Sequence, residues 1–271
     1  MPELPEVEVT CRGIAPHITH QTMSKAIVRQ RQLRWPIPHD FAKMVQGQPI
    51  IAVKRRAKYL LLSTTNGTII IHLGMSGRLK LVPIDLPADK HDHVDLLFNN
   101  KTILRYTDPR RFGAILWTKD DPLTHPLLKD LGPEPLEKKF TADYLFAQTK
   151  NRRIPVKTFI MTNQIVVGVG NIYANEALFM AGIHPQRPAH LLTYQECEIL
   201  VKAIKVILKK AIKEGGTTLR DFFNSDGKPG YFQQTLRVYG RHEQPCVVCG
   251  QVLQSITQGQ RRTVFCGVCQ K

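Results

Sequence analysis

Two sets of residues in this 271-residue chain have the types and the spacing that chemistry requires. The first set is four cysteines, in two Cys-x2-Cys pairs separated by a 16-residue gap: Cys246, Cys249, Cys266 and Cys269. Each pair directs two thiolates toward one point, and two pairs on a hairpin form a closed tetrahedral Zn²⁺ site. A closed site leaves no coordination position for a substrate, so the spacing predicts one structural zinc ion. Two disulfides or a redox pair are the alternatives.

The second set is Pro2 and Glu3. Removal of Met1, which is usual before a small residue such as proline, would leave a secondary amine at the chain end. An α-amino group titrates near pH 8, about 2 units below lysine, so more of it is an uncharged nucleophile at neutral pH. Its attack on a sugar C1′ carbon would give an iminium ion that favours elimination, with Glu3 transferring protons. Proline is common at position 2, so these residues alone have little specificity.

Charge narrows the class of partner. The 38 Lys and Arg residues exceed the 22 Asp and Glu residues, a formal net charge of +16. This excess indicates a polyanion, with nucleic acid first and an anionic membrane surface second. Segments of aliphatic residues interrupt the basic ones, which argues against disorder, and no segment approaches the roughly 18 apolar residues of a membrane span. The chain opens without a signal-peptide pattern, which predicts a reducing, cytoplasmic location.

The first 120 residues read as a helix followed by strands. Val7, Cys11, Ile14 and Ile18 fall at helical spacing within residues 6–18. The pair Asn66-Gly67, between two aliphatic segments, is typical of a two-residue hairpin turn. The predicted strands are residues 25–29, 50–55, 59–63, 68–73, 94–98, 102–106 and 113–117. Such a series indicates an antiparallel β-sandwich or barrel.

The second half of the chain is predominantly helical. Residues 118–136 hold four prolines and little periodicity, as a connection would. Thr193 and Glu196 form a capping box that opens a helix, which Gly215-Gly216 ends. One face of this helix is apolar, and the opposite face is best read as solvated: Lys202, Lys205, Lys209 and Lys213. Cys11 and Cys197 lie on apolar helix faces and are predicted to be core thiols.

Several segments resemble one family in order along the whole chain. Residues 1–8, Met-Pro-Glu-Leu-Pro-Glu-Val-Glu, resemble the N-terminal signature of bacterial formamidopyrimidine-DNA glycosylases, which excise oxidised purines. Further matching segments are residues 55–60, 71–77, 90–95, 106–113, 167–173, 225–231 and the four-cysteine ribbon. The resemblance implies an α+β fold: an N-terminal antiparallel β-sandwich with an N-terminal helix, then a helical domain with a helix–two-turns–helix motif and a C-terminal β-hairpin zinc finger. The implied boundaries are 2–131 for the catalytic sandwich, 132–150 for a linker, 151–235 for the helical domain and 236–271 for the zinc hairpin.

The resemblance also implies catalytic roles. Pro2 would be the nucleophile that displaces the damaged base and forms a Schiff base, and Glu3 the acid/base group. Lys58 would contact phosphate and assist β-elimination, and Arg261 would grip phosphate and assist δ-elimination. The neighbouring Arg262 departs from the family pattern. Glu6 would be a second acidic residue near the site, with a less defined role.

DNA contacts are implied in the same way. Met75, Arg110 and Phe112 would fill the space left by an everted base, with Arg110 facing the orphaned partner. Phosphates would be contacted by His91, Arg153, Lys157 and Asn171. The pair His91 and His93 lacks further ligands for a metal, and the glycines before Asn171 lack the third glycine of a dinucleotide fingerprint. Residues 217–231, which include Lys228, would close over the everted purine.

The sequence therefore predicts a bifunctional DNA glycosylase/AP lyase that is a monomer and acts on double-stranded DNA containing 8-oxoguanine or formamidopyrimidines. An endonuclease VIII-type glycosylase for oxidised pyrimidines is the nearest alternative, against which Leu4-Pro5, Met75, Arg110 and Phe112 argue. From a different class, a non-catalytic zinc-ribbon protein that binds nucleic acid would fit the charge and the cysteines. Such a binding protein would not require an N-terminal Pro2 amine followed by Glu3, whereas the enzyme would.

Overall fold

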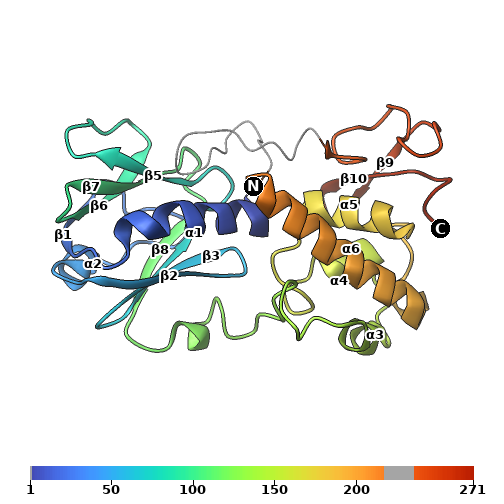
Figure 1. The fold of residues 1–271 in the computed structure, drawn as a ribbon, viewed down its shortest axis with the longest axis horizontal. Coiled ribbons are helices and arrows are strands. Elements are labelled where there is room, and N and C mark those ends of the chain that lie inside the picture. Colours follow the sequence, from blue (N-terminus) through green and yellow to red (C-terminus); the bar gives the residue numbers. More distant parts are fainter. Residues whose placement is uncertain (1, 217–234) are drawn as a thin grey trace. The chain divides into compact units, whose positions relative to one another are not determined.

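The computed structural model describes residues 2–216 and 235–271 (Figure 1). The chain divides into two compact units. The first consists of Met1–Lys129 and Glu214–Tyr231, and the second of Asp130–Lys213 and Phe232–Lys271. No helix in the described residues is long and apolar enough to cross a membrane.

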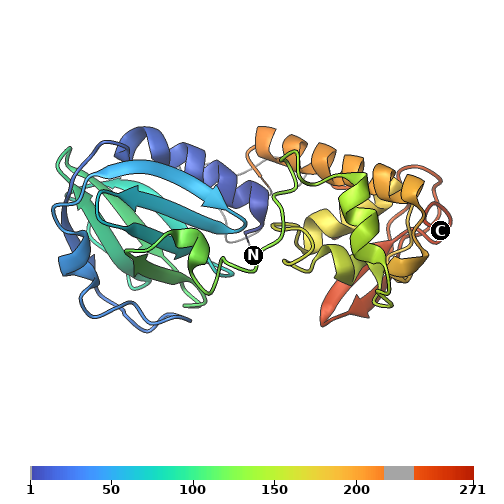
Figure 2. The same ribbon diagram turned by 90° about the horizontal axis from the view of Figure 1, so that it is seen from below.

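The first unit begins with helix α1 (Leu4–Ile18), as the periodicity predicts. The helix starts two residues earlier than predicted because a proline, here Pro5, is tolerated in the first turn. Its buried side chains, among them Val7 and Ile14, belong to the core of the sandwich. The helix lies beside strands of both sheets (Figures 1 and 2). Cys11 on this face is 7% exposed, and burial raises the pKa of its thiol to about 11, so it is the predicted core thiol.

Two four-stranded antiparallel sheets follow. One has the order β1-β6-β7-β5 and the other β2-β3-β4-β8. The strands are β1 (Met23–Val28), β2 (Ile50–Arg56), β3 (Tyr59–Thr64), β4 (Thr68–His72), β5 (Arg78–Pro83), β6 (Asp92–Phe98), β7 (Thr102–Thr107) and β8 (Ala114–Thr118). A short helix α2 (Phe41–Val45) and a 3-10 turn η1 (Pro122–Thr124) accompany them. The predicted antiparallel sandwich is confirmed.

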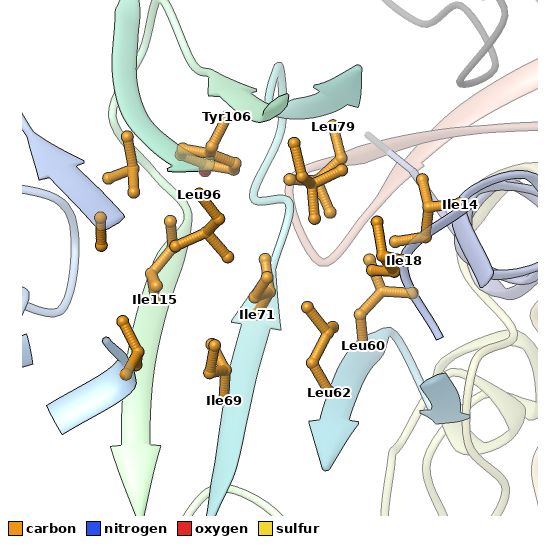
Figure 3. Close-up of a cluster of buried hydrophobic side chains, with 14 of the residues drawn as sticks. Ile14, Ile18, Leu60, Leu62, Ile69, Ile71, Leu79, Leu96, Tyr106 and Ile115 are labelled. Carbon is orange, nitrogen blue, oxygen red and sulfur yellow. The ribbon is translucent and has the colours of Figure 1, made fainter. Parts of the chain in front are cut away.

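The core of the first unit lies between the two sheets (Figure 3). Alternate residues of each strand point into it, as Leu60 and Leu62 do on β3 and Ile69 and Ile71 do on β4. The predicted β3–β4 hairpin is present, but Asn66-Gly67 is not its central pair. Thr64 and Gly67 are hydrogen-bonded to each other, so the loop is Thr65-Asn66. Gly67 is needed beside it because a Cβ there would lie 2.4 Å from the Thr118 carbonyl oxygen.

The second unit contains the helices α3 (Ala142–Thr149), α4 (Val156–Ile160), α5 (Asn171–Ala181) and α6 (Tyr194–Lys213), the 3-10 turn η2 (Ala189–Leu191) and a hairpin of β9 (Gln254–Gln258) and β10 (Arg261–Phe265). Thr193 and Glu196 form the predicted capping box of α6, with reciprocal hydrogen bonds of 2.8 and 3.2 Å. Helix α3 lies within residues 132–150, where a linker is predicted; Thr141 caps it and Leu145 anchors it. Cys197 is fully buried on α6.

Candidate active site and zinc centre

The N-terminus of α1 holds three of the predicted residues. Pro2 is buried, and Glu3 and Glu6 are 2% and 1% exposed. The Glu3 backbone N–H donates to Glu6 Oε2 at 2.8 Å, which satisfies one of the free N–H groups at the helix start. The Glu6 carboxylate therefore fixes the backbone of the residue that follows Pro2. Gly216, with φ 82°, comes close to the same carboxylate, since a Cβ built there would lie 3.1 Å from Glu6 Oε1.

Lys58 lies in the two-residue turn between β2 and β3, where Arg56 pairs with Tyr59. Ala57, the other turn residue, has φ 54° and is buried. Arg55 holds this turn against α1, because its Nη1 donates to the Ala57 carbonyl at 2.9 Å and its Nε to Glu8 Oε2 at 2.8 Å. Burial alone would raise the pKa of Glu8, but Arg55 and Arg12 outweigh it and hold the pKa below its usual value. Sequence reasoning missed this tie between Lys58 and the N-terminal helix.

His72, at the end of β4, was also missed as a candidate. Its Nδ1 accepts a hydrogen bond from the Gly74 N–H at 3.0 Å, and its ring lies 4.9 Å from that of Tyr59. Burial and the positive charges of Lys58 and Arg34 lower its pKa to about 4, against an opposing effect of Asp108. At neutral pH His72 is therefore an uncharged imidazole whose Nε2 carries the proton. The signal was available, since His72 lies in the matching segment 71–77 and precedes a glycine turn.

The three residues predicted to fill the space of an everted base lie on two loops of the first unit. Met75 is 39% exposed and Phe112 is 42% exposed, although both are large and apolar. The guanidinium of Arg110 lies 4.8 Å from the centre of the Phe112 ring. Met75 and Phe112 are therefore not core residues, and their exposure suits contact with something outside the protein. His91, at the start of the segment that leads into β6, is half-buried, and its backbone carbonyl accepts from the Asp108 N–H.

In the second unit, Lys157 and Asn171 are brought together with the β9–β10 hairpin. Lys157 is 1% exposed, and its Nζ donates to Asn171 Oδ1 and to Thr263 Oγ1, both at 2.6 Å. Asn171, the first residue of α5, donates through Nδ2 to the Arg262 carbonyl at 3.1 Å. The ammonium group of Lys157 is thus directed into the protein, where it supports Asn171 and strand β10.

Arg261 is exposed at the start of β10, directly after the turn of Gly259 and Gln260, which both have positive φ. Nη1 of Arg262, its neighbour, lies 3.3 Å from Nε2 of His242. Arg153 is exposed just before α4. The predicted closing segment 217–231, with Lys228, lies outside the described residues.

The four predicted cysteines meet at one point. Their sulfur atoms all lie within 4.8 Å of one another, with 3.9 Å between Cys246 and Cys269 and 3.5 Å between Cys249 and Cys266. A zinc ion bound tetrahedrally by thiolates at about 2.3 Å requires sulfur separations of about 3.8 Å. Backbone N–H groups of Val248 and Cys269 point at the sulfurs of Cys246 and Cys266 at 3.4 Å, as expected for thiolates. The cluster fits one structural zinc ion, as predicted, and its cysteines pack with the core residues Phe179, Val238, Leu253 and Val264.

Comparison with known proteins covers the whole chain. Residues 1–115 match the formamidopyrimidine-DNA glycosylase N-terminal domain, residues 131–223 the H2TH domain of the same enzymes, and residues 243–271 a zinc finger found in FPG and IleRS. The formamidopyrimidine-DNA glycosylases of Proteus mirabilis and Shewanella piezotolerans are both 56% identical to this chain, over 100% of it and 98% and 100% of their own lengths.

Solved structures agree with these relatives. The MutM (FPG) protein of Thermus thermophilus is 36% identical with a TM-score of 0.90, covering 99% of this chain and 98% of its own. Lactococcus lactis Fpg in complex with DNA containing an abasic site is 32% identical with a TM-score of 0.92, covering 99% of both chains. Sequence, domain order and fold therefore agree over the full length, and this chain belongs to the formamidopyrimidine-DNA glycosylase family.

Proposed function

We propose that this protein is a DNA glycosylase with AP lyase activity, which removes 8-oxoguanine and formamidopyrimidines from double-stranded DNA in base-excision repair. The observation that carries the proposal is the N-terminal arrangement. Pro2 is followed by the buried Glu3, and the Glu6 carboxylate accepts a hydrogen bond from the Glu3 backbone N–H. This arrangement occurs in a chain that belongs to the formamidopyrimidine-DNA glycosylase family. Solved relatives from Lactococcus lactis are complexes with DNA that contains Fapy-dG or an abasic site.

The chemistry begins at the Pro2 amine once Met1 is removed. The amine nitrogen attacks C1′ of the damaged nucleotide and the C1′–N bond to the base breaks. The base leaves with the proton that the amine nitrogen gives up. Glu3 donates a proton to the ring oxygen as the C1′–O4′ bond opens, which leaves an iminium ion between Pro2 and C1′. Because a secondary amine gives an iminium that cannot lose a proton from nitrogen, its positive charge acidifies the C2′ hydrogen.

Strand cleavage follows from that acidity. Loss of the C2′ proton expels the 3′ phosphate in the β-elimination, and a second elimination expels the 5′ phosphate. Lys58 stabilises the first of these leaving phosphates, and the exposed Arg261 assists the second. The neutral His72 beside Lys58 adds no competing positive charge, and its Nε2–H can donate a hydrogen bond to an anion.

Each unit supplies DNA contacts of its own in this proposal. In the first unit His91 contacts phosphate, while Met75, Arg110 and Phe112 occupy the space of the everted base. In the second unit Asn171 and Arg153 contact phosphate, and the buried Lys157 acts on that contact through its 2.6 Å hydrogen bond to Asn171. One zinc ion holds the hairpin that carries Arg261.

The same proposal divides the chain by role into the catalytic domain 2–131, a linker at 132–150, the helical domain 151–235 and the zinc hairpin 236–271. The protein acts as a monomer in the cytoplasm, on the DNA of the nucleoid.

Borohydride trapping tests the nucleophile. The processed protein, with Met1 removal verified by mass spectrometry, is incubated with a duplex containing 8-oxoguanine opposite cytosine and reduced, and the adduct is mapped by proteolysis. We expect a covalent adduct on Pro2, and faster excision than from a duplex with an oxidised pyrimidine. An adduct on a lysine would remove Pro2 from its role, and the absence of any adduct would refute the lyase mechanism.

A further inference from the structure

Two loops of the first unit carry the exposed residues Met75, Arg110 and Phe112. The Met75 turn (residues 73–77) joins β4 to β5, and the Arg110 loop (residues 109–113) joins β7 to β8. Strands β4 and β8 are neighbours in one sheet, and β5 and β7 are neighbours in the other. Both loops therefore cross from one sheet to the other at the same end of the sandwich.

A single carboxylate connects the two loops. Asp108, which follows β7, is fully buried. Its Oδ1 accepts from Ser76 Oγ at 2.7 Å, and its Oδ2 accepts from the Gly113 N–H at 2.9 Å and from the Tyr106 hydroxyl at 3.0 Å. Ser76 Oγ accepts in turn from the Arg110 N–H at 3.2 Å. The Asp108 side chain thus contacts the Met75 turn through Ser76, the end of the Arg110 loop through Gly113, and strand β7 through Tyr106. Ser76 connects it to the start of the Arg110 loop.

Two glycines near Asp108 allow the backbones of the two loops to approach each other closely. A Cβ on Gly74 would lie 2.5 Å from the Phe112 carbonyl carbon, and a Cβ on Gly113 would lie 1.8 Å from the Tyr106 hydroxyl oxygen. The two loops are therefore packed backbone against backbone, with the Tyr106 hydroxyl beneath them. The Met75 turn is thus in close contact with the Phe112 backbone.

We propose that Asp108, with Ser76 and Tyr106, is a positioning unit that fixes Met75 relative to Arg110 and Phe112, and so sets base eversion and recognition of the opposite base. The inference rests on the proposed function, because it assigns a purpose to the three exposed side chains. Asp108 itself is fully buried and acts through the loops. Because Asp108, Ser76 and Tyr106 do not touch the reacting atoms in the proposed mechanism, the unit should affect base eversion in duplex substrates more than the chemistry at C1′.

Two mild variants test the proposal without removing the buried carboxylate. Ser76→Ala removes the link between Asp108 and the Arg110 N–H, and Tyr106→Phe removes one donor to Oδ2. Matched controls are Ser24→Ala, which loses a 3.2 Å bond to the Leu97 carbonyl, and Tyr144→Phe, which loses a 2.9 Å bond to the Ile165 carbonyl in the second unit. All variants are compared with the wild-type protein on the same substrates.

We expect both variants to excise 8-oxoguanine from a duplex about tenfold more slowly, as small misplacements of contacting groups do. The ratio of excision opposite cytosine to excision opposite adenine should also fall. Cleavage of a single-stranded oligonucleotide with a preformed abasic site should stay within about twofold of wild type, since it requires no eversion. The two controls should match wild type on every substrate.

A double-mutant cycle separates positioning from general destabilisation. If Ser76 acts in part through the position of the Arg110 side chain, Ser76→Ala should reduce duplex excision by a smaller factor in an Arg110→Ala background than in wild type. Additive losses in the cycle, equal losses on duplex and single-stranded substrates, or unchanged opposite-base discrimination would each overturn the inference. Failure of the wild-type protein to excise 8-oxoguanine would instead overturn the proposed function, so the two outcomes are distinct.

Discussion

At the scale of single residues, the surroundings of two side chains, Glu6 and His72, bear on the proposed chemistry. The Glu6 carboxylate accepts from the Glu3 N–H, so the group next to the Pro2 amine is fixed before any substrate arrives. His72 is neutral because burial and neighbouring positive charge lower its pKa to about 4. Neither role follows from residue type alone, since each depends on which groups the fold places around the side chain.

His72 gives a pH-dependent stability whose sign can be stated. Its pKa is about 4 in the folded protein and about 6.5 in an unfolded chain, so the unfolded state takes up the proton first. Its contribution is complete above pH 6.5 and is lost as the pH falls toward 4, with an upper limit of about 3 kcal/mol. Urea unfolding, followed by the fluorescence of the two tryptophans, Trp35 and Trp117, should show this loss in wild type and a smaller one in His72→Gln.

The exposed His39→Gln variant is the control and should follow the wild-type pH dependence. Both tryptophans lie in the first unit, as His72 does, so the signal reports on the correct unit. A His72→Gln protein with the full wild-type pH dependence would show that another group is responsible.

At the scale of elements, the β2–β3 turn and α1 are held together by one arginine. Arg55 contacts both the Ala57 carbonyl and Glu8, and its side chain is only 10% exposed. The turn carries Lys58, and α1 begins beside Pro2. Arg55 therefore fixes the turn that carries Lys58 relative to α1, which begins beside the proposed nucleophile Pro2.

Arg55→Ala should lower the rate of strand cleavage at an abasic site by about tenfold, because Lys58 loses its support. It should also lower the free energy of unfolding by about 1–3 kcal/mol, the usual effect of removing one partner of a buried charged hydrogen bond. Arg12→Ala is the matched control, since Arg12 also pairs with Glu8, at 2.7 Å, but from the exposed side of α1, where its side chain is 66% exposed. Equal cleavage rates in the two variants would contradict the assigned role.

Elements were predictable where periodicity is strong. The apolar spacing of α1 and the capping box of α6 locate both helices, and the aliphatic segments locate most strands. Strand β5 was missed because it is an edge strand that ends in Pro83, and α3 because it is a short helix in a segment read as a connection. In the site, the zinc ligands follow from spacing alone. The hydrogen bonds of Asp108 with Ser76 and of Arg55 with Glu8 do not, because these partners are separated by 32 and 47 residues in the sequence.

At the scale of the whole molecule, zinc and charge act separately from the N-terminal chemistry. The zinc cluster belongs to the second unit, where Val264 and Thr263 of β10 bond to Asn175 and Lys157. The net charge of +16 is spread along the chain and provides attraction to DNA without regard to sequence.

Removal of zinc by a chelator should unfold the β9–β10 hairpin and weaken duplex binding strongly, because structural zinc sites contribute folding energy directly. Tryptophan fluorescence, which reports on the first unit, should stay unchanged. In one sample, chelator is added stepwise while released zinc, duplex binding and tryptophan fluorescence are measured. Full excision activity after complete zinc removal would show that the hairpin is dispensable.

Salt dependence distinguishes phosphate contacts from solvated lysines. Each phosphate contact contributes about 0.9 to the slope of log affinity against log salt concentration. Arg261→Ala should therefore reduce the slope by about 1, while Lys209→Ala, on the exposed face of α6, should leave it unchanged. Filter binding of an abasic-site duplex between low and moderate salt provides the measurement. A change of slope in the Lys209 variant would mean that the lysine face of α6 touches DNA.

The division of the chain into units also limits how recombination of genes could transfer one unit to another protein. The chain leaves the first unit after Lys129 and returns to it at Glu214, where Gly216 comes close to Glu6. The N-terminal 129 residues thus lack a segment of their own unit, and a downstream fragment would carry that segment as a foreign insertion. Neither unit is a contiguous module, so gene fusion or domain shuffling cannot transfer the Pro2 unit to another protein by a single cut.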